Sequence, residues 1–191
     1  MSGGGELADV AIRAYRPADE PSWLRCRVLA FLQTGYFDDV RTEKPPVDGG
    51  LELVAVDGDD VVGLLDVSID VPAATIESVA VDPQRCRQGI GTALLERALG
   101  ELRRLGVRRV EAWTREDEPA NRWYRRNGFR EAERYLHVYA NGREETDRAV
   151  TAEPGLVAVH AFLHLLDMDR ETEMRDRFGR VYVCRCYERS V

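Results

Sequence analysis

Residues 79–95 read VAVDPQRCRQGIGTALL and divide into three parts. The β-branched residues that precede Asp82 predict a strand, which Pro83 ends because proline has no N–H to give a sheet ladder. Beyond Gly89, apolar side chains recur every three or four residues as far as Leu105, which is the period of one helix face. The stretch therefore predicts a strand, a glycine-containing loop and a helix.

Two glycines, Gly89 and Gly91, stand where the loop enters the helix. Without side chains they let an anion approach main-chain N–H groups that no helical carbonyl satisfies, although such glycines could also make only a tight turn. No Gly-Lys-Ser/Thr follows as in a P-loop, and a GxGxxG dinucleotide pattern would need glycine at Leu94. We therefore predict a phosphate-binding loop of a different kind.

A second segment, residues 117–129, reads DEPANRWYRRNGF. Together and in this order, the two segments resemble the GCN5-related N-acetyltransferase (GNAT) superfamily. Its loop pattern is Arg/Gln-x-x-Gly-x-Gly/Ala, and Cys86 occupies the first position here, flanked by Arg85 and Arg87. The resemblance covers about residues 10–139 and the final strand.

The resemblance implies an α/β fold, with a mixed, mostly antiparallel central sheet, about four flanking helices and a splayed strand pair that holds the cofactor. It also implies an N-acetyltransferase that moves an acetyl group from acetyl-CoA to a primary amine by direct attack in a ternary complex, without a metal. The acceptor would be a small molecule or a protein amine. The alternative is a non-catalytic acyl-CoA-binding or sensor module of the same fold.

The resemblance further implies the cofactor-binding residues. Main-chain groups of residues 79–81 would pair with the pantetheine arm and polarise the thioester, and the loop would hold the diphosphate. Asp117 stands where the superfamily often has an asparagine that contacts the cofactor arm, and Asn121 is a substitute one helical turn later. The full predicted set is Val79, Ala80, Val81, Arg87, Gln88, Gly89, Ile90, Gly91, Thr92, Asp117 and Asn121.

Acetyl transfer needs a neutral amine, a stabilised oxyanion and a proton for the departing thiolate. By the resemblance, Tyr124 is the general acid; a core aromatic is the other interpretation of this residue. Two glutamates on predicted strands could act as the base, directly or through a water, and we favour Glu77 over Glu111. Regular pleating would put Glu77 on the face of Val79 and Val81, and a bulge would change this.

Periodicity and turn residues predict the remaining elements. They are a strand at 10–15, a helix through residue 31, a loop at 41–50, a hairpin over 51–69, a strand at 107–114, a helix at 118–127 and a strand at 129–139. The segment 141–154 is predicted to be a polar connection, 156–166 a strand in preference to a helix, 169–178 a helix and 181–187 a final strand. We expect a flexible leader at 1–9, an acetyltransferase core at 10–140 and a C-terminal extension at 141–191 that includes the closing strand of the same domain.

The composition limits the number of domains, the binding partners and the cellular location that we expect. The chain has 191 residues, 44% of them hydrophobic and 32% charged, which suits one domain with a full core. A net charge of −7 disfavours nucleic-acid binding, whereas acidic residues such as Asp38, Asp39 and Glu43 would attract a cationic amine. We expect a cytoplasmic protein that does not bind membranes, with four free thiols and a possible homodimer through the final strand.

Overall fold

The computed structural model describes residues 10–47 and 49–191, so the predicted leader at 1–9 lies outside the described residues. The chain divides into two units. The first comprises residues up to Ala112 together with 126–129 and 188–191, and the second comprises residues 113–125 and 130–187. No helix among the described residues is long and apolar enough to cross a bilayer.

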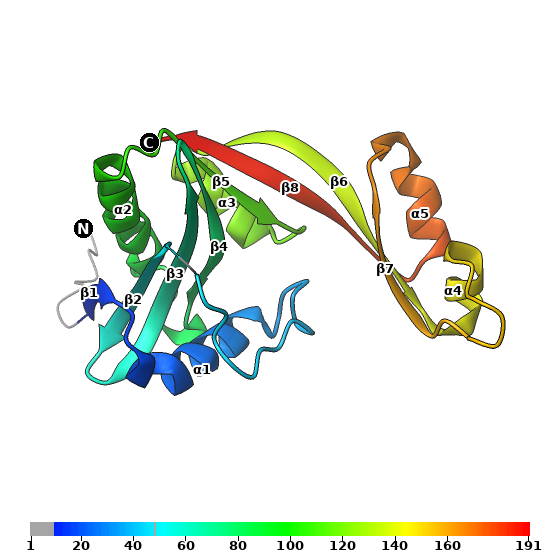
Figure 1. Cartoon of the computed structure of the whole chain (residues 1–191), viewed down its shortest axis with the longest axis horizontal. Helices are drawn as coiled ribbons and strands as arrows, with labels where there is room; N and C mark the ends of the chain where they lie inside the picture. The colour runs from blue at the N-terminus through cyan, green and yellow to red at the C-terminus, as the bar shows by residue number, and fades with distance from the viewer. Residues whose placement is uncertain (1–9, 48) are drawn as a thin grey trace, which may run out of the picture. The chain divides into compact units, whose positions relative to one another are not determined.

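The first unit is a sheet with a helix on each face (Figure 1). Its strands lie in the order β1-β2-β3-β4-β5, and neighbours run antiparallel except for β4 and β5, which are parallel. Its elements are β1 (Val10–Ala14), η1 (Pro17–Asp19), α1 (Glu20–Phe31), β2 (Leu51–Asp57), β3 (Asp60–Asp70), β4 (Ala73–Val81), η2 (Pro83–Arg85), α2 (Ile90–Arg104) and the first four residues of β5 (Arg109–Thr114). The predicted strand, loop and helix at 79–95 are thus confirmed.

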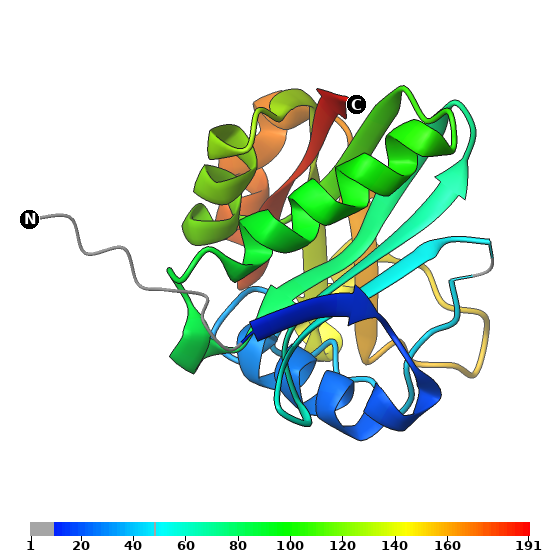
Figure 2. The same ribbon diagram turned by 90° about the vertical axis from the view of Figure 1, so that its left-hand side faces the viewer.

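Residue alternation along β3 places α1 and α2 on opposite faces of this sheet. Leu64 packs in one cluster with Trp23 of α1, whereas the neighbouring Gly63 faces Ile90 and Leu94 of α2. Because successive strand residues point to opposite faces, the two helices cover the two sides. In Figure 2, α2 lies in front of the strands.

A bulge interrupts the pairing of β3 with β4. Asp66 pairs with Ser78 and Val67 pairs with Ile76, so Glu77 is the extra residue on β4. Regular pleating is therefore the wrong assumption for Glu77. The bulge breaks the alternation on which the predicted face of this side chain depended.

The second unit contains strands in the order β8-β6-β7. Its elements are α3 (Glu118–Arg126) through Arg125, β6 (Arg130–Asn141), α4 (Gly142–Ala149), β7 (His160–Leu165), η3 (Met168–Arg170), α5 (Glu171–Arg177) and β8 (Arg180–Ser190) through Tyr187. Leu136 and Val138 of β6 share a buried cluster with Met174, Phe178 and Val183.

Two predictions about this second unit have different outcomes. The strand interpretation of 156–166 is confirmed, with the narrower bounds His160–Leu165. The polar connection predicted at 141–154 is wrong in part, because Gly142–Ala149 forms α4. This helix buries Thr146, whose hydroxyl donates to the Ala158 carbonyl (2.6 Å), so a contact distant in sequence helps to hold it.

The four cysteines form no disulfide. Cys26, Cys184 and Cys186 are buried, and Cys86 is exposed. Among the described elements there are five α-helices and a mostly antiparallel set of strands. The predicted mixed α/β fold is therefore confirmed.

Candidate active site

The glycine loop leaves β4 through a tight turn. The Asp82 carboxylate accepts a hydrogen bond from the Gln84 N–H (2.8 Å), and the Asp82 N–H donates to the Val62 carbonyl (3.0 Å). Farther on, φ is 63° at Arg87 and 85° at Gly89. Left-handed residues in a turn direct successive N–H groups toward a common concavity, which is how main-chain anion sites are built.

Contacts of the Arg85 side chain help to hold the shape of the loop. The Arg85 guanidinium pairs with the Asp57 carboxylate at the end of β2 and donates to Gln88 Oε1 (3.1 Å). Cys86 Sγ lies 3.5 Å from the Asp82 carbonyl, and desolvation raises the pKa of this thiol. Cys86 therefore stays neutral at pH 7, which leaves the main-chain N–H groups and the exposed Arg87 side chain as the groups of the loop that can bind an anion.

The start of α2 is packed closely against β3. Ala93 N–H makes a helical hydrogen bond to the Gly89 carbonyl (2.9 Å), so the N–H groups of residues 90–92 precede the helical ladder. A Cβ at Gly63 would lie 2.7 Å from Ile90 Cγ2. The glycine in β3 thus lets the helix start sit directly on the sheet, beside the end of β4.

The parallel ladder between β4 and β5 is short. It runs from the Ala73–Arg109 pair to the Ile76–Ala112 pair, although β4 continues to Val81. Toward β3, the pairing of β4 continues to its end. The second half of β4 therefore lies outside this ladder, just before the loop, and the splay of the two strands stays a prediction.

The two candidate bases lie on neighbouring strands of the first unit. Glu77 is exposed in the bulge of β4, and its carboxylate accepts a hydrogen bond from Ser68 Oγ (2.6 Å). Glu111 of β5 accepts one from Thr75 Oγ1 (3.3 Å) and lies 3.9 Å from the Arg109 guanidinium. An exposed carboxylate can meet an incoming amine or a water, whereas Glu111 is already engaged by a cation.

Tyr124 belongs to α3 in the second unit. Its side chain is 4% exposed, and its ring stacks on Tyr187 (centroids 5.3 Å apart, 13° between planes). Trp123 meets the same ring edge-on at 4.9 Å. These contacts fix the ring and leave the hydroxyl as its polar end.

The other predicted residues on α3 are part of its N-terminal structure. Asp117 accepts a hydrogen bond from the Ala120 N–H, and burial raises the pKa of its carboxyl. Asn121 is 3% exposed; its Nδ2 donates to the carbonyls of Arg115 (2.9 Å) and Asp117 (2.7 Å), and its Oδ1 accepts from the Tyr187 hydroxyl (2.8 Å). Both amide hydrogens are used inside the protein, so Asn121 positions α3.

Comparison with known proteins identifies the family. Residues 9–129 match the model of the Acetyltransferase (GNAT) family. This chain belongs to that family. It is 30% identical over 135 residues to a mycothiol acetyltransferase of Clavibacter michiganensis subsp. michiganensis, covering 65% of this chain and 44% of the relative. The corresponding enzyme of Sanguibacter keddieii is 34% identical over 139 residues, 64% of this chain and 44% of that relative, so this GNAT chain matches less than half the length of these curated relatives.

Solved structures support the GNAT fold. The ribosomal-protein-S18-alanine N-acetyltransferase from Escherichia coli has a TM-score of 0.61 at 17% identity, over 95% of this chain and 94% of that one. The PaiA N-acetyltransferase from Thermoplasma acidophilum, solved in complex with coenzyme A, has a TM-score of 0.60 at 14% identity, over 65% of this chain and 91% of that one. At these identities the likeness concerns the fold.

The GNAT loop has room for an anionic group. A Cβ built on Gly89 meets no heavy atom within 4 Å, and the N–H groups of the helix start lie next to it in sequence. The diphosphate of coenzyme A is an anion of the kind that such groups bind. The glycine loop of the first unit therefore fits the diphosphate of the cofactor that the sequence predicts, whereas Asp117, Asn121 and Tyr124 belong to the second unit.

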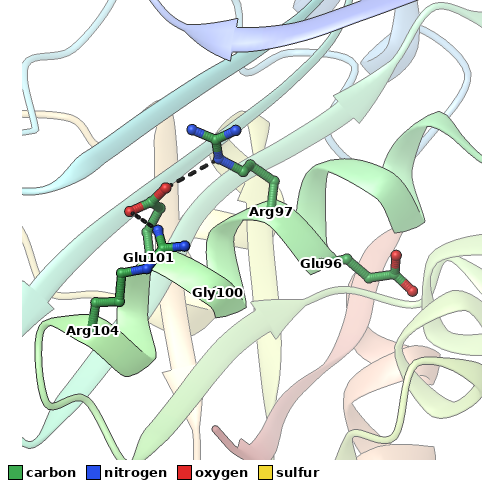
Figure 3. A pocket seen from close by; sticks show the side chains of 5 residues that line it. All are labelled: Glu96, Arg97, Gly100, Glu101 and Arg104. Carbon is green, nitrogen blue, oxygen red and sulfur yellow. Dashed lines mark hydrogen bonds and ion pairs between the residues drawn. The ribbon is translucent and has the colours of Figure 1, made fainter.

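A shallow pocket on α2 is a different feature of this GNAT chain. It is lined by Glu96, Arg97, Gly100, Glu101 and Arg104, and Figure 3 shows two arginines directed at Glu101. These are ion pairs within one helix, at 3.1 Å and 2.9 Å. The pocket contains none of the predicted site residues.

Sequence reasoning missed a buried charged cluster on the α1 face of the sheet. Lys44 pairs with Glu52 and lies near Asp66, and burial is the main cause that raises the pKa of Asp66 to about 7. A signal was present in residues 61–67, VVGLLDV, where one carboxylate interrupts an otherwise apolar strand. Its partners could not be read from the sequence, because Lys44 lies in a loop without periodicity.

Proposed function

We propose that this protein transfers the acetyl group of acetyl-CoA to a primary amine by direct attack in a ternary complex. The observation that carries the proposal is the end of β4. Its ladder with β5 ends at Ile76, and the strand continues to Val81 and into the loop that precedes α2. Acetyl-CoA bound beside the second half of β4 would contact main-chain N–H groups of this strand with its pantetheine arm. Its diphosphate would then lie at the anion site of the glycine loop.

Each proposed residue has one task. Main-chain N–H groups of Arg87–Thr92 bind the diphosphate, and those of Val79–Val81 orient the pantetheine arm and polarise the thioester oxygen. Coenzyme A supplies the activated acetyl group when bound. Glu77 takes the proton of the incoming ammonium, directly or through a water, and Tyr124 gives a proton to the departing sulfur. Asp117 lies at the start of α3, where it would contact the cofactor arm.

The acceptor is proposed only as a class. The curated relatives are named mycothiol acetyltransferases, and this chain matches less than half of their length, so we carry over amine acetylation and leave the molecule open. Of the acidic residues expected to attract a cation, Asp39 already pairs with Arg27 (2.7 Å) and Arg41 (3.1 Å). We further propose that the enzyme is cytoplasmic. A homodimer stays a prediction, but β8 has a neighbouring strand on each side and offers no free edge for the expected contact.

A single assay separates this function from a non-catalytic acyl-CoA-binding module. The protein is incubated with acetyl-CoA and a pool of primary amines, and thiol release, acetylated mass and thermal midpoint are recorded together. An enzyme releases thiol and forms an acetylated amine. A sensor shows a raised midpoint without either product, because ligand binding stabilises the folded state. Neither effect at millimolar acetyl-CoA would reject both functions.

A further inference from the structure

A buried lysine between α1 and β2 is held by two carboxylates. The side chain of Lys44 is 2% exposed; its Nζ pairs with Glu52 of β2 and lies 3.5 Å from Asp66 Oδ2 of β3. The same Nζ lies 4.8 Å from the ring centroid of Tyr15 and 5.3 Å from that of Trp23. Carboxylates combined with aromatic faces are the groups that bind a primary ammonium in proteins.

One carboxylate oxygen beside Lys44 has no hydrogen-bond donor. Asp66 is 3% exposed, and its Oδ1 has no hydrogen-bond partner among the described residues. A buried carboxylate oxygen without a partner is costly, so the cluster lacks a donor as it stands.

The cluster lies beside the candidate site, within the same unit. Asp66 pairs with Glu52 on one side and with Ser78 of β4 on the other. Ser68, two residues beyond Asp66 and therefore on the same face of β3, donates to Glu77. Buried Asp66, half-buried Glu52 and the proposed base thus share one face of the sheet, on adjacent strands.

We infer that Glu52 and Asp66 form a second ammonium site, which Lys44 fills in this structure and which a protonated amine of the acceptor fills when Lys44 moves out. The consequence for catalysis rests on the proposed function. An attacking amine must be neutral, whereas a carboxylate pair favours the charged form. The acceptor is therefore a diamine or polyamine: one nitrogen stays charged at Glu52 and Asp66, and another loses its proton near Glu77 and receives the acetyl group.

Chemical rescue tests the site without acetyl-CoA. Lys44→Ala empties the site and keeps both carboxylates, so n-butylamine at about 20 mM should raise the thermal midpoint of this variant by about 3 °C or more. Wild type, whose site is filled, should not shift, and neither should Lys44→Ala with 1-butanol, which has the same chain without the charge. If Lys44→Ala does not fold alone, recovery of a cooperative transition in n-butylamine is the supporting result.

The matched control is Lys44→Ala combined with Asp66→Asn, which keeps the volume of the side chain and removes its charge. The inference predicts that n-butylamine no longer stabilises this double variant. Equal shifts in the single and double variants would overturn the site. So would a folded Lys44→Ala that the amine leaves unchanged, or an unfolded one that the amine does not restore.

A second measurement addresses the acceptor. For wild type, kcat/KM should be about tenfold or more higher for 1,4-diaminobutane than for n-butylamine, and Asp66→Asn should abolish most of this preference because a charge-assisted contact is lost. Equal kcat/KM values for 1,4-diaminobutane and n-butylamine in wild type would overturn the diamine assignment. They would leave the proposed acetyl transfer intact. If n-butylamine stabilised Lys44→Ala but wild type acetylated no amine, the ammonium site would be supported and the proposed function would be rejected.

Discussion

Tyr124 and Asn121 both lie on α3, yet their environments suit different tasks. Both amide hydrogens and the side-chain carbonyl oxygen of Asn121 form hydrogen bonds within the protein, so this side chain stabilises the helix. The ring of Tyr124 stacks on that of Tyr187 and meets Trp123 edge-on. A ring fixed by its faces can keep its position when the hydroxyl is removed, which makes this residue suitable for a clean substitution.

The substitution Tyr124→Phe removes the proposed proton donor and retains the stacked ring. We expect kcat for acetyl transfer to fall by about a hundredfold or more, because that is the usual loss with a general acid. Thiol release gives the rate, and calorimetry should show acetyl-CoA affinity within about threefold of wild type. A kcat within about threefold of wild type would remove Tyr124 from the mechanism.

Asp66 predicts an unusual pH dependence of stability. Its pKa is raised from 3.8 to about 7, chiefly by burial, so the folded protein binds a proton there that the unfolded chain has lost. The stabilising contribution is therefore full below the unfolded pKa and is lost as the pH rises through about 7. Relative to Asp66→Asn, wild type should lose on the order of 2–4 kcal/mol of unfolding free energy between pH 4 and pH 8. Urea titrations of both proteins across this range would show parallel curves if Asp66 titrated normally.

Local signals account for the elements that were predicted well. The strand, loop and helix at 79–95 are bounded by proline and glycine, whose effects act on the adjacent backbone. By contrast, α4 is polar and depends on distant partners: Glu145 accepts from the N–H groups of Asn141 and Gly179, and Thr146 donates to Ala158. The bulge at Glu77 and the contacts of Lys44 with β2 and β3 likewise arise only when strands meet, so the surroundings of Glu77 could not be predicted from the sequence.

The contact between α2 and β3 can be tested with a pair of glycines. Gly63→Ala would place a methyl 2.7 Å from Ile90 Cγ2, so the helix start must shift, at a cost of about 1–3 kcal/mol. We expect weaker acetyl-CoA binding in calorimetry, together with a lower thermal midpoint. Gly100→Ala is the control, because its Cβ meets no atom within 4 Å and alanine favours a helix by roughly 0.5–1 kcal/mol. Unchanged stability and affinity in Gly63→Ala would mean that the loop tolerates movement of α2.

Each of the two units has its own buried cluster, one centred on Trp23 and Leu64, the other on β6, Met174 and Phe178. The residues between β6 and β8 therefore contribute to a core of their own. Since opening free energies follow local packing, the two units need not lose protection together. Two phenylalanines of the second unit allow a test: Phe178 is buried (5% exposed), whereas Phe162 is 47% exposed.

Phe178→Ala should remove core packing from the second unit at a cost of about 3–5 kcal/mol. In hydrogen exchange, amides of β6, β7 and α5 should then lose protection, whereas those of β2 and β3 should keep it, because their cluster does not include Phe178. Phe162→Ala is the matched control: the same atoms are removed from a partly exposed position, so protection should change far less. Equal loss of protection in β2 and β3 would show that the two clusters open as one cooperative unit.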